Sequence, residues 1–134
     1  MPMTILRNSR QPGKESELKG ATFTGDVWAD PIYVNPSDGA NMNNMMFTPS
    51  ARTHWHEHEF GCVLLVNAGS GWVCDRGGKP EKLSVGDIVW APPGTVHWHG
   101  ADEHSYMLHH AISFGKTTWF EAVNDAQYNE RNSK

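Results

Sequence analysis

His54-Trp55-His56-Glu57-His58 is one of two short stretches that together hold five of the eight histidines of this chain, and His97-Trp98-His99 is the other. Residues two apart in an extended strand point to the same face. His56 and His58 are therefore expected to project together, as are His97 and His99. Two such strands brought together would place three or four imidazoles around one ion. Imidazole suits iron, manganese, zinc, nickel and copper.

Length and composition limit the class of protein. With 134 residues and 19% charged residues, the chain is expected to form one domain over residues 21–134, preceded by an arm or edge strand over residues 1–20. The net charge is -4 and there is no basic run, so nucleic acid is excluded as a partner. No apolar run approaches the roughly 18 residues of a membrane span. The two cysteines and the polar N-terminus indicate a soluble, cytoplasmic protein.

Short apolar, β-branched runs separated by glycine and proline predict an all-β sandwich or barrel. A turn is expected at 35–39, a hairpin at 67–71 and one helix at 119–129, capped by Thr117 or Thr118. A single buried polar cluster favours a barrel with the site at its mouth. The predicted strands are residues 21–28, 32–34, 41–48, 52–58, 61–66, 72–75, 82–84, 88–91, a strand from 97, and 106–114.

Two spaced motifs resemble those of the cupin superfamily. Gly86, Pro92, Gly94 and His97 have the spacing of the second cupin motif, and only its closing asparagine is replaced, by Ala101. The first motif fits in part, over His56, His58, position 62 and Gly69, with Ser50 at its opening glycine and Cys62 at its usual glutamate. The resemblance implies a jelly-roll barrel.

The likeness extends to the stretches 23–27, 51–53, 68–72, 86–90, 93–101, 107–109 and 119–128. There the chain is similar to small bacterial cupins that include manganese-dependent hydroxynitrile lyases. This resemblance implies one divalent metal per chain and a homodimer or higher homo-oligomer. In those lyases the equivalents of His56, His58 and His97, with a glutamine at position 62, hold the metal. The equivalents of His99 and His109 lie near the substrate.

Cys62 and His54 depart from that pattern. Cys62 is either a soft fourth ligand or a small buried apolar residue, and a thiolate would favour zinc or iron over manganese. Eukaryotic thiol dioxygenases, which are also cupins, have a cysteine there beside a three-histidine iron. His54 stands where the lyases carry a small residue. Manganese or iron is the expected metal, and zinc or nickel also suits the ligands.

The alternation of side chains along each predicted strand, called strand parity below, assigns the remaining candidate residues to the inside or the outside of the barrel. His99 and His109 are expected to be catalytic acids, bases or hydrogen-bond donors, the alternative being that they orient a metal ligand. Trp98 should point away from the metal. Arg52 should pair with a carboxylate, the alternative being that it holds an anionic substrate. The expected pocket walls are His54, Asn43, Met45 and Ser113, with plain barrel filling or exposure at the mouth as the alternative. His104 is expected at the surface, His110 outside the barrel, and Cys74 as a reduced structural thiol.

The sequence thus predicts a metal-dependent enzyme acting on a small oxygen-bearing substrate. A lyase of the hydroxynitrile type is the first hypothesis, with the metal as Lewis acid and a histidine moving the proton. An Fe(II) dioxygenase with a three-histidine site is the alternative. A non-catalytic cupin that binds a metal or small ligand is the third.

Overall fold

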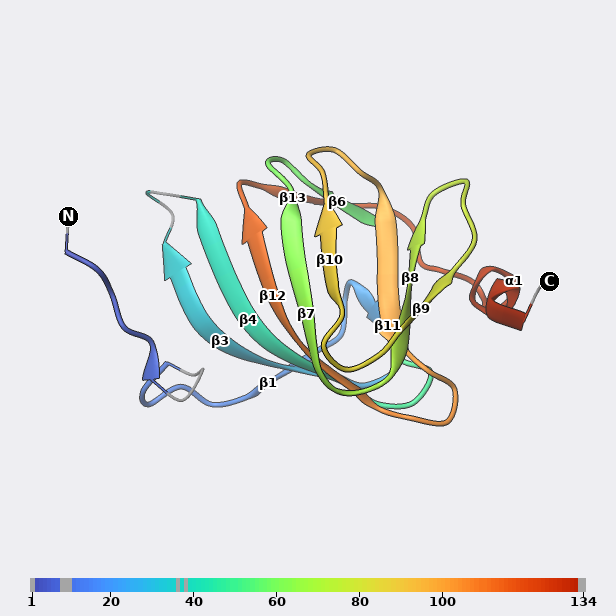
Figure 1. Ribbon diagram of the computed structural model, residues 1–134, viewed down its shortest axis with the longest axis horizontal. Coiled ribbons are helices and arrows are strands. Elements are labelled where there is room, and N and C mark those ends of the chain that lie inside the picture. The colour runs from blue at the N-terminus through green and yellow to red at the C-terminus, as the bar shows by residue number, and fades with distance from the viewer. Residues whose placement is uncertain (1, 8–10, 36, 38, 133–134) are drawn as a thin grey trace.

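Two antiparallel sheets curl around a common interior in the computed structural model, which describes residues 2–7, 11–35, 37 and 39–132 (Figure 1). The first sheet has six strands in the order β1-β3-β4-β12-β7-β10. Its strands are β1 (Glu17–Lys19), β3 (Val27–Asn35), β4 (Ala40–Phe47), β12 (Met107–Phe114), β7 (Cys62–Gly69) and β10 (Ile88–Ala91).

The second sheet follows the order β13-β6-β11-β5-β2, with β8 added beside β11 and β9 beside β8. It carries both histidine-rich stretches, on β6 and β11. Its strands are β13 (Thr117–Trp119), β6 (His56–His58), β11 (His97–Ala101), β5 (Arg52–Thr53), β2 (Phe23–Thr24), β8 (Gly71–Asp75) and β9 (Glu81–Leu83). The all-β prediction is confirmed.

The core lies between the sheets because alternate residues of each strand point inward. On β7, Cys62, Leu64 and Val66 are buried, whereas the residues between them are more exposed. Val27 of β3, Phe47 of β4 and Met107 of β12 join Val66 in one apolar cluster. The interior is therefore packed at one end, and the histidines lie beside this packed region.

Two of the predicted strands, residues 21–28 and 32–34, have different limits in the structure. Residues 21–28 do not form one strand, because Gly25 bends the chain at φ +79° between β2 and β3. β3 then continues without a break from Val27 through Pro31 to Asn35 and so joins the two predicted strands, with a register shift between Pro31 and Tyr33. Proline is tolerated at such a bulge, where no ladder hydrogen bond is needed from it. Pro36 and Asp38 of the turn predicted at 35–39 lie outside the described residues.

The predicted histidine strand at 52–58 is interrupted at residues 54–55, which separate β5 from β6. The prediction of a hairpin at 67–71 is wrong: the chain turns at Ser70, but β7 pairs with β12 and β10 of the first sheet whereas β8 pairs with β11 and β9 of the second, so the turn carries the chain from one sheet to the other. Gly69 has φ +73°, and a Cβ there would overlap the carbonyl oxygen of Tyr106. Only glycine meets both conditions without strain.

The C-terminal helix is shorter and later than predicted. α1 covers Asp125–Tyr128 and is followed by a 3-10 turn, η2 (Asn129–Asn132). Asn124 caps α1 through a capping box with Gln127. The prediction of a helix from 119 capped by Thr117 or Thr118 is wrong, because Thr117–Trp119 forms β13 along β6. Within the described residues, no helix is long and apolar enough to span a membrane.

Tyr128 fastens this tail to the second sheet. Its hydroxyl donates a hydrogen bond to the Ala101 carbonyl at 2.7 Å. Its ring contacts two guanidinium groups, that of Arg52 at 4.5 Å and that of Arg131 at 3.7 Å from the ring centre. Arg52 also donates to the Val123 carbonyl at 2.9 Å, so the tail and β5 are held together.

Candidate metal centre

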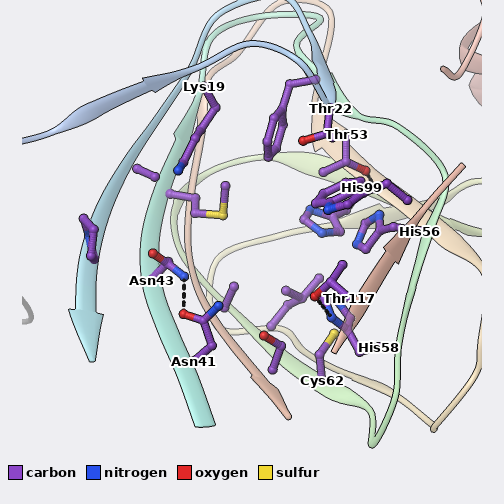
Figure 2. Close-up of a pocket in the computed structure, with 18 of the residues that line it drawn as sticks. Lys19, Thr22, Asn41, Asn43, Thr53, His56, His58, Cys62, His99 and Thr117 are labelled. Carbon is purple, nitrogen blue, oxygen red and sulfur yellow. Dashed lines mark hydrogen bonds between the residues drawn. The ribbon is translucent and has the colours of Figure 1, made fainter. Parts of the chain in front are cut away.

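The paired strands β6 and β11 bring His56 and His97 directly opposite each other, as their sequence patterns predicted. Their ring centres are 4.4 Å apart. His58, at the other end of β6, has its ring centre 5.1 Å from that of His56 and 5.9 Å from that of His97. The three imidazoles therefore form one buried or half-buried cluster, and Figure 2 shows two of them, His56 and His58, with His99 nearby.

One nitrogen of each ring is already engaged. Nδ1 of His56 bonds to the carbonyl of His54, and Nδ1 of His97 to the carbonyl of Thr95, each at 2.9 Å. Nδ1 of His58 lies 2.9 Å from the Thr117 hydroxyl. A carbonyl only accepts, so the first two rings donate from Nδ1 and keep an unprotonated Nε2. Nε2 of His97 is buried without a partner among the described residues, as a metal ligand would be.

Two sets of donor atoms each lie within 4.8 Å of one another. His56, His97 and His99 form one set, and His58, Cys62 and His97 form the other. His97 belongs to both, whereas His56 and His58 do not share a set. The donors are imidazole nitrogens and a thiol sulfur, which suit iron, zinc and other transition metals. The cluster is therefore able to hold a metal ion.

Burial keeps these imidazoles uncharged. It lowers the pKa of His56 and of His99 well below its ordinary value, and lowers the pKa of His58 to about 4. The pKa of His97 is lowered for the same reason. Neutral imidazole is the form that binds a metal, so the rings need lose no proton at neutral pH.

Cys62 begins β7 beside this cluster, with its side chain only 1% exposed. It forms no disulfide. Burial raises the pKa of its thiol to about 12, so the free side chain is a neutral thiol at physiological pH. A metal would have to displace that proton before the sulfur became a strong ligand.

A cavity of about 510 Å³ opens beside the cluster. As predicted, Asn43, Met45 and Ser113 lie on its wall. Most of the wall comes from the inner faces of β3, β4, β7 and β12 and from β1. The described lining residues are Glu17, Lys19, Thr22, Phe23, Ala29, Pro31, Val34, Asn41, Asn43, Met45, Thr53, His56, His58, Cys62, Leu64, His99, Ala111, Ser113, Thr117 and Trp119.

His54 is not among the residues of this wall, contrary to the prediction. The prediction assumed an unbroken alternation from position 52 to position 58. The strand is broken at residues 54–55, so parity with His56 is lost there. His54 contributes its carbonyl oxygen, which orients the His56 ring.

His99 and His109 lie at different depths in the interior of the barrel. His99 lines the cavity, whereas His109 is fully buried and does not. The His109 ring lies 5.0 Å from that of His99 and 5.2 Å from that of Phe47. His109 has the same inward parity as Ala111 and Ser113 on β12, but it lies nearer the start of the strand, beside Phe47 and Met107 of the packed core, and so does not reach the cavity. Neither of its ring nitrogens has a hydrogen-bond partner among the described residues.

The structure agrees with four further predictions. Trp98 is buried in a separate cluster with Trp55 and Tyr128, away from the cavity. Arg52 pairs with the Asp125 carboxylate at 2.9 Å. His104 is exposed at the surface, and Cys74 is a buried free thiol.

Thr117, Lys19 and Glu17 were not recognised as site residues from the sequence. Thr117 was assigned to a helix cap, although three consecutive residues with β-branched or aromatic side chains begin there, which is a strand signal. Lys19 and Glu17 belong to the arm or edge strand predicted over residues 1–20, and the structure has them on β1 at the edge of the first sheet. Their alternation with Leu18 would have indicated a strand with a polar face, but not which sheet it joins.

Comparisons with known proteins agree with this geometry. A family model described as Cupin domain matches residues 43–110. An (R)-mandelonitrile lyase of Granulicella tundricola is 40% identical over 126 residues, which cover 89% of this chain and 96% of that protein. A cupin-like protein of Thermotoga maritima has a TM-score of 0.83 at 33% identity, covering 92% of this chain and all of the other.

A more distant solved structure shares only the fold. A polyketide cyclase of Streptomyces resistomycificus has a TM-score of 0.70 at 16% identity, and the match covers 99% of this chain and 98% of that one. The family match, the 40% identical lyase and the curled sheets agree with one another. This chain belongs to the cupin family and has its jelly-roll barrel.

Proposed function

We propose that this chain is a metal-dependent lyase that cleaves small hydroxynitriles to an aldehyde or ketone and hydrogen cyanide. The observation that carries the proposal is the set of pre-oriented imidazoles of His56, His58 and His97 beside a cavity that a further neutral imidazole, His99, also lines. The similarity to a mandelonitrile lyase supports the same reaction class.

His56, His58 and His97 would hold one divalent ion, manganese or iron, through their Nε2 atoms. Cys62 is the fourth donor within reach, because its sulfur lies within 4.8 Å of the donor atoms of His58 and His97. When bound, the ion supplies Lewis acidity toward the substrate oxygen. The chain's own contribution is to fix the rings by hydrogen bonds that leave the ligand nitrogens free.

His99 is assigned the proton transfer. Its pKa lies well below the ordinary value because of burial, with smaller contributions from His109 and His56, so it is neutral and able to accept a proton. It takes the proton of the substrate hydroxyl while the carbon–carbon bond to the nitrile breaks. The electron pair of that bond leaves with cyanide, the carbonyl forms, and His99 then protonates cyanide.

His109 has a supporting role in this proposal, since it contacts His99 and not the cavity. The apolar wall formed by Phe23, Met45, Leu64 and Ala111 would receive the body of the substrate. Such a wall also excludes water, which strengthens the electrostatic interactions inside the cavity.

Cyanide release from racemic mandelonitrile by protein loaded with manganese, iron or zinc tests the proposal. His99→Gln is expected to lower kcat by about 100-fold or more, the usual contribution of a positioned acid or base. His104→Gln, at an exposed position, is the matched control. His97→Ala should lose both metal and activity, and retention of both would contradict the proposal.

Iron-loaded protein should also be assayed for oxygen uptake with thiols, phenols and diketones. The buried thiol of Cys62 beside three imidazoles is the feature that keeps an Fe(II) dioxygenase as the second candidate. Oxygen uptake without cyanide release would favour the dioxygenase over the lyase.

A homodimer or larger homo-oligomer stays a prediction. Light scattering during gel filtration would measure the oligomeric state.

A further inference from the structure

Strand β1 presents two charged side chains to the cavity. Lys19 pairs with Val27 and Glu17 with Ala29 in the register of β1 and β3. Paired residues of neighbouring strands point to the same face, and Val27 and Ala29 are buried in the core. Leu18 between them lies on the outer face and is 56% exposed. Lys19 and Glu17 are therefore directed inward by the strand itself, and both line the cavity.

Lys19 is the one lysine or arginine among the described residues that line the cavity. Its ammonium donates to the Glu17 carboxylate at 2.8 Å, and that hydrogen bond lowers the pKa of Glu17. The Glu17 carboxylate is therefore held in its charged form. An ammonium has three donors, and the bond to Glu17 uses one of them. The side chain of Lys19 is 38% exposed, so its head is half-buried at the cavity mouth.

Charged and polar side chains lie on opposite sides of the cavity. Lys19 lies on the side opposite His56 and His58, with its nitrogen directed into the space between them (Figure 2). Apolar side chains, Phe23 and Leu64 among them, also line the cavity. This arrangement matches a molecule that has a reacting oxygen at one end, an apolar body, and an anionic group at the other end.

We propose that Lys19 is a specificity residue that binds a carboxylate on the part of the substrate remote from the reacting oxygen. This inference rests on the proposed function, because it concerns the preferred substrate of that lyase. A singly charged carboxylate suits the site better than a phosphate. Lys19 supplies the one ammonium among the described residues that line the cavity, and the neighbouring Glu17 would repel a dianion more strongly than a monoanion.

The substrate class is therefore a hydroxynitrile, or the corresponding aldehyde, that carries a distal carboxylate. Glu17 limits the affinity because it competes for the same ammonium. Removing its charge should strengthen binding of an anionic substrate, whereas removing Lys19 should weaken it. Opposite effects of two neighbouring substitutions would not result from a general disturbance of β1.

The test compares two cyanohydrins of similar shape, those of 4-formylbenzoate and of 4-formylbenzamide. Wild-type protein loaded with manganese should favour the acid over the amide in kcat/KM. Lys19→Met should reduce that ratio by about fivefold, the effect of losing one partly exposed charge pair. Glu17→Gln should increase the ratio. Lys79→Met, which removes an exposed lysine outside the cavity, is the matched control and should leave the ratio unchanged.

Binding of unreactive analogues separates this inference from the proposed function. The loaded protein is titrated with 4-(hydroxymethyl)benzoate and 4-(hydroxymethyl)benzamide by the fluorescence of its tryptophans, since Trp119 lines the cavity. Preference for the acid that falls in Lys19→Met supports the role of Lys19, even if neither cyanohydrin is cleaved and the lyase proposal fails. If both cyanohydrins are cleaved and the ratio of kcat/KM for the acid over the amide is the same in wild type, Lys19→Met and Glu17→Gln, the role proposed for Lys19 is wrong. The lyase proposal would then still stand.

Discussion

Nδ1 of His58 lies 2.9 Å from the hydroxyl oxygen of Thr117, so this imidazole is oriented by a side chain. His56 and His97 are oriented by backbone carbonyls. A hydroxyl both donates and accepts, whereas a carbonyl only accepts. The tautomer of His58 is therefore less constrained than those of the other two rings, and its position depends on one residue of β13.

Thr117→Val should weaken metal binding without unfolding the protein. Valine keeps the β-branched shape that suits β13 but removes the hydroxyl beside His58. Loss of such an orienting partner typically costs roughly 10- to 100-fold in metal affinity. Competition with a chromophoric chelator measures this. Thr118→Val is the control from the same strand, and an equal loss in both variants would show that β13, not the hydroxyl, is responsible.

Cys62→Gln should shift the metal preference of the site. An amide oxygen is a harder donor than sulfur and favours manganese over zinc. Elemental analysis of wild type, Cys62→Ala and Cys62→Gln, each refolded or expressed with equal supplies of manganese, iron and zinc, gives the occupancies. A thiolate-to-cobalt charge-transfer band in the cobalt-substituted wild type, absent from Cys62→Ala, would identify the sulfur as a ligand. Its absence from both would make Cys62 a bystander.

Stability of the metal-free protein should fall on acidification. Burial lowers the pKa of His109 from 6.5 to about 4. Between these two values the unfolded chain binds a proton that the folded chain does not, so unfolding becomes easier as the pH falls from 6.5 to 4. For this one histidine the full loss is about 3 kcal/mol, since one pKa unit corresponds to about 1.4 kcal/mol.

Urea unfolding at a series of pH values measures that loss. His109→Phe should flatten the dependence, because phenylalanine fills similar space beside Phe47 and takes up no proton. His104→Asn, at an exposed position, should leave the profile of the wild type unchanged. A profile that stays equally steep in His109→Phe would show that other groups dominate it.

Tyr128→Phe should lower the free energy of unfolding by about 1 kcal/mol, the usual worth of one hydrogen bond. The change removes the donor to the Ala101 carbonyl but keeps the ring between Arg52 and Arg131. Urea midpoints at neutral pH are the measurement. Tyr106→Phe is the control, because that ring is 48% exposed. Equal midpoints for both variants would contradict a stabilising role for the Tyr128 hydroxyl.

Sequence reasoning predicted much of the candidate site because strand parity is a local property. Asn43, Met45 and Ser113 lie on the cavity wall since β4 and β12 are regular where those residues occur. Parity failed for His54, where the strand is broken without a proline or glycine to mark the break. Parity placed His109 correctly on the inner face, but it could not show that this part of the interior is filled by core side chains.

Pairing between distant segments could not be predicted from local patterns. Thr117 reaches His58 only because β13 lies along β6, and Lys19 reaches the cavity only because β1 joins the edge of β3. These contacts depend on long-range topology, which no short window of sequence encodes. The C-terminal helix was misplaced for the same reason, since pairing with β6 outweighed the helical pattern from residue 119.

His56 and His97 share one local arrangement: each begins a strand, and each ring bonds to the carbonyl two residues earlier. Contacts this short in sequence form early in folding, before distant strands meet, because they close very small loops. Pairing of β6 with β11 then sets the two rings opposite each other, so closure of the second sheet is also the step that assembles this part of the candidate site.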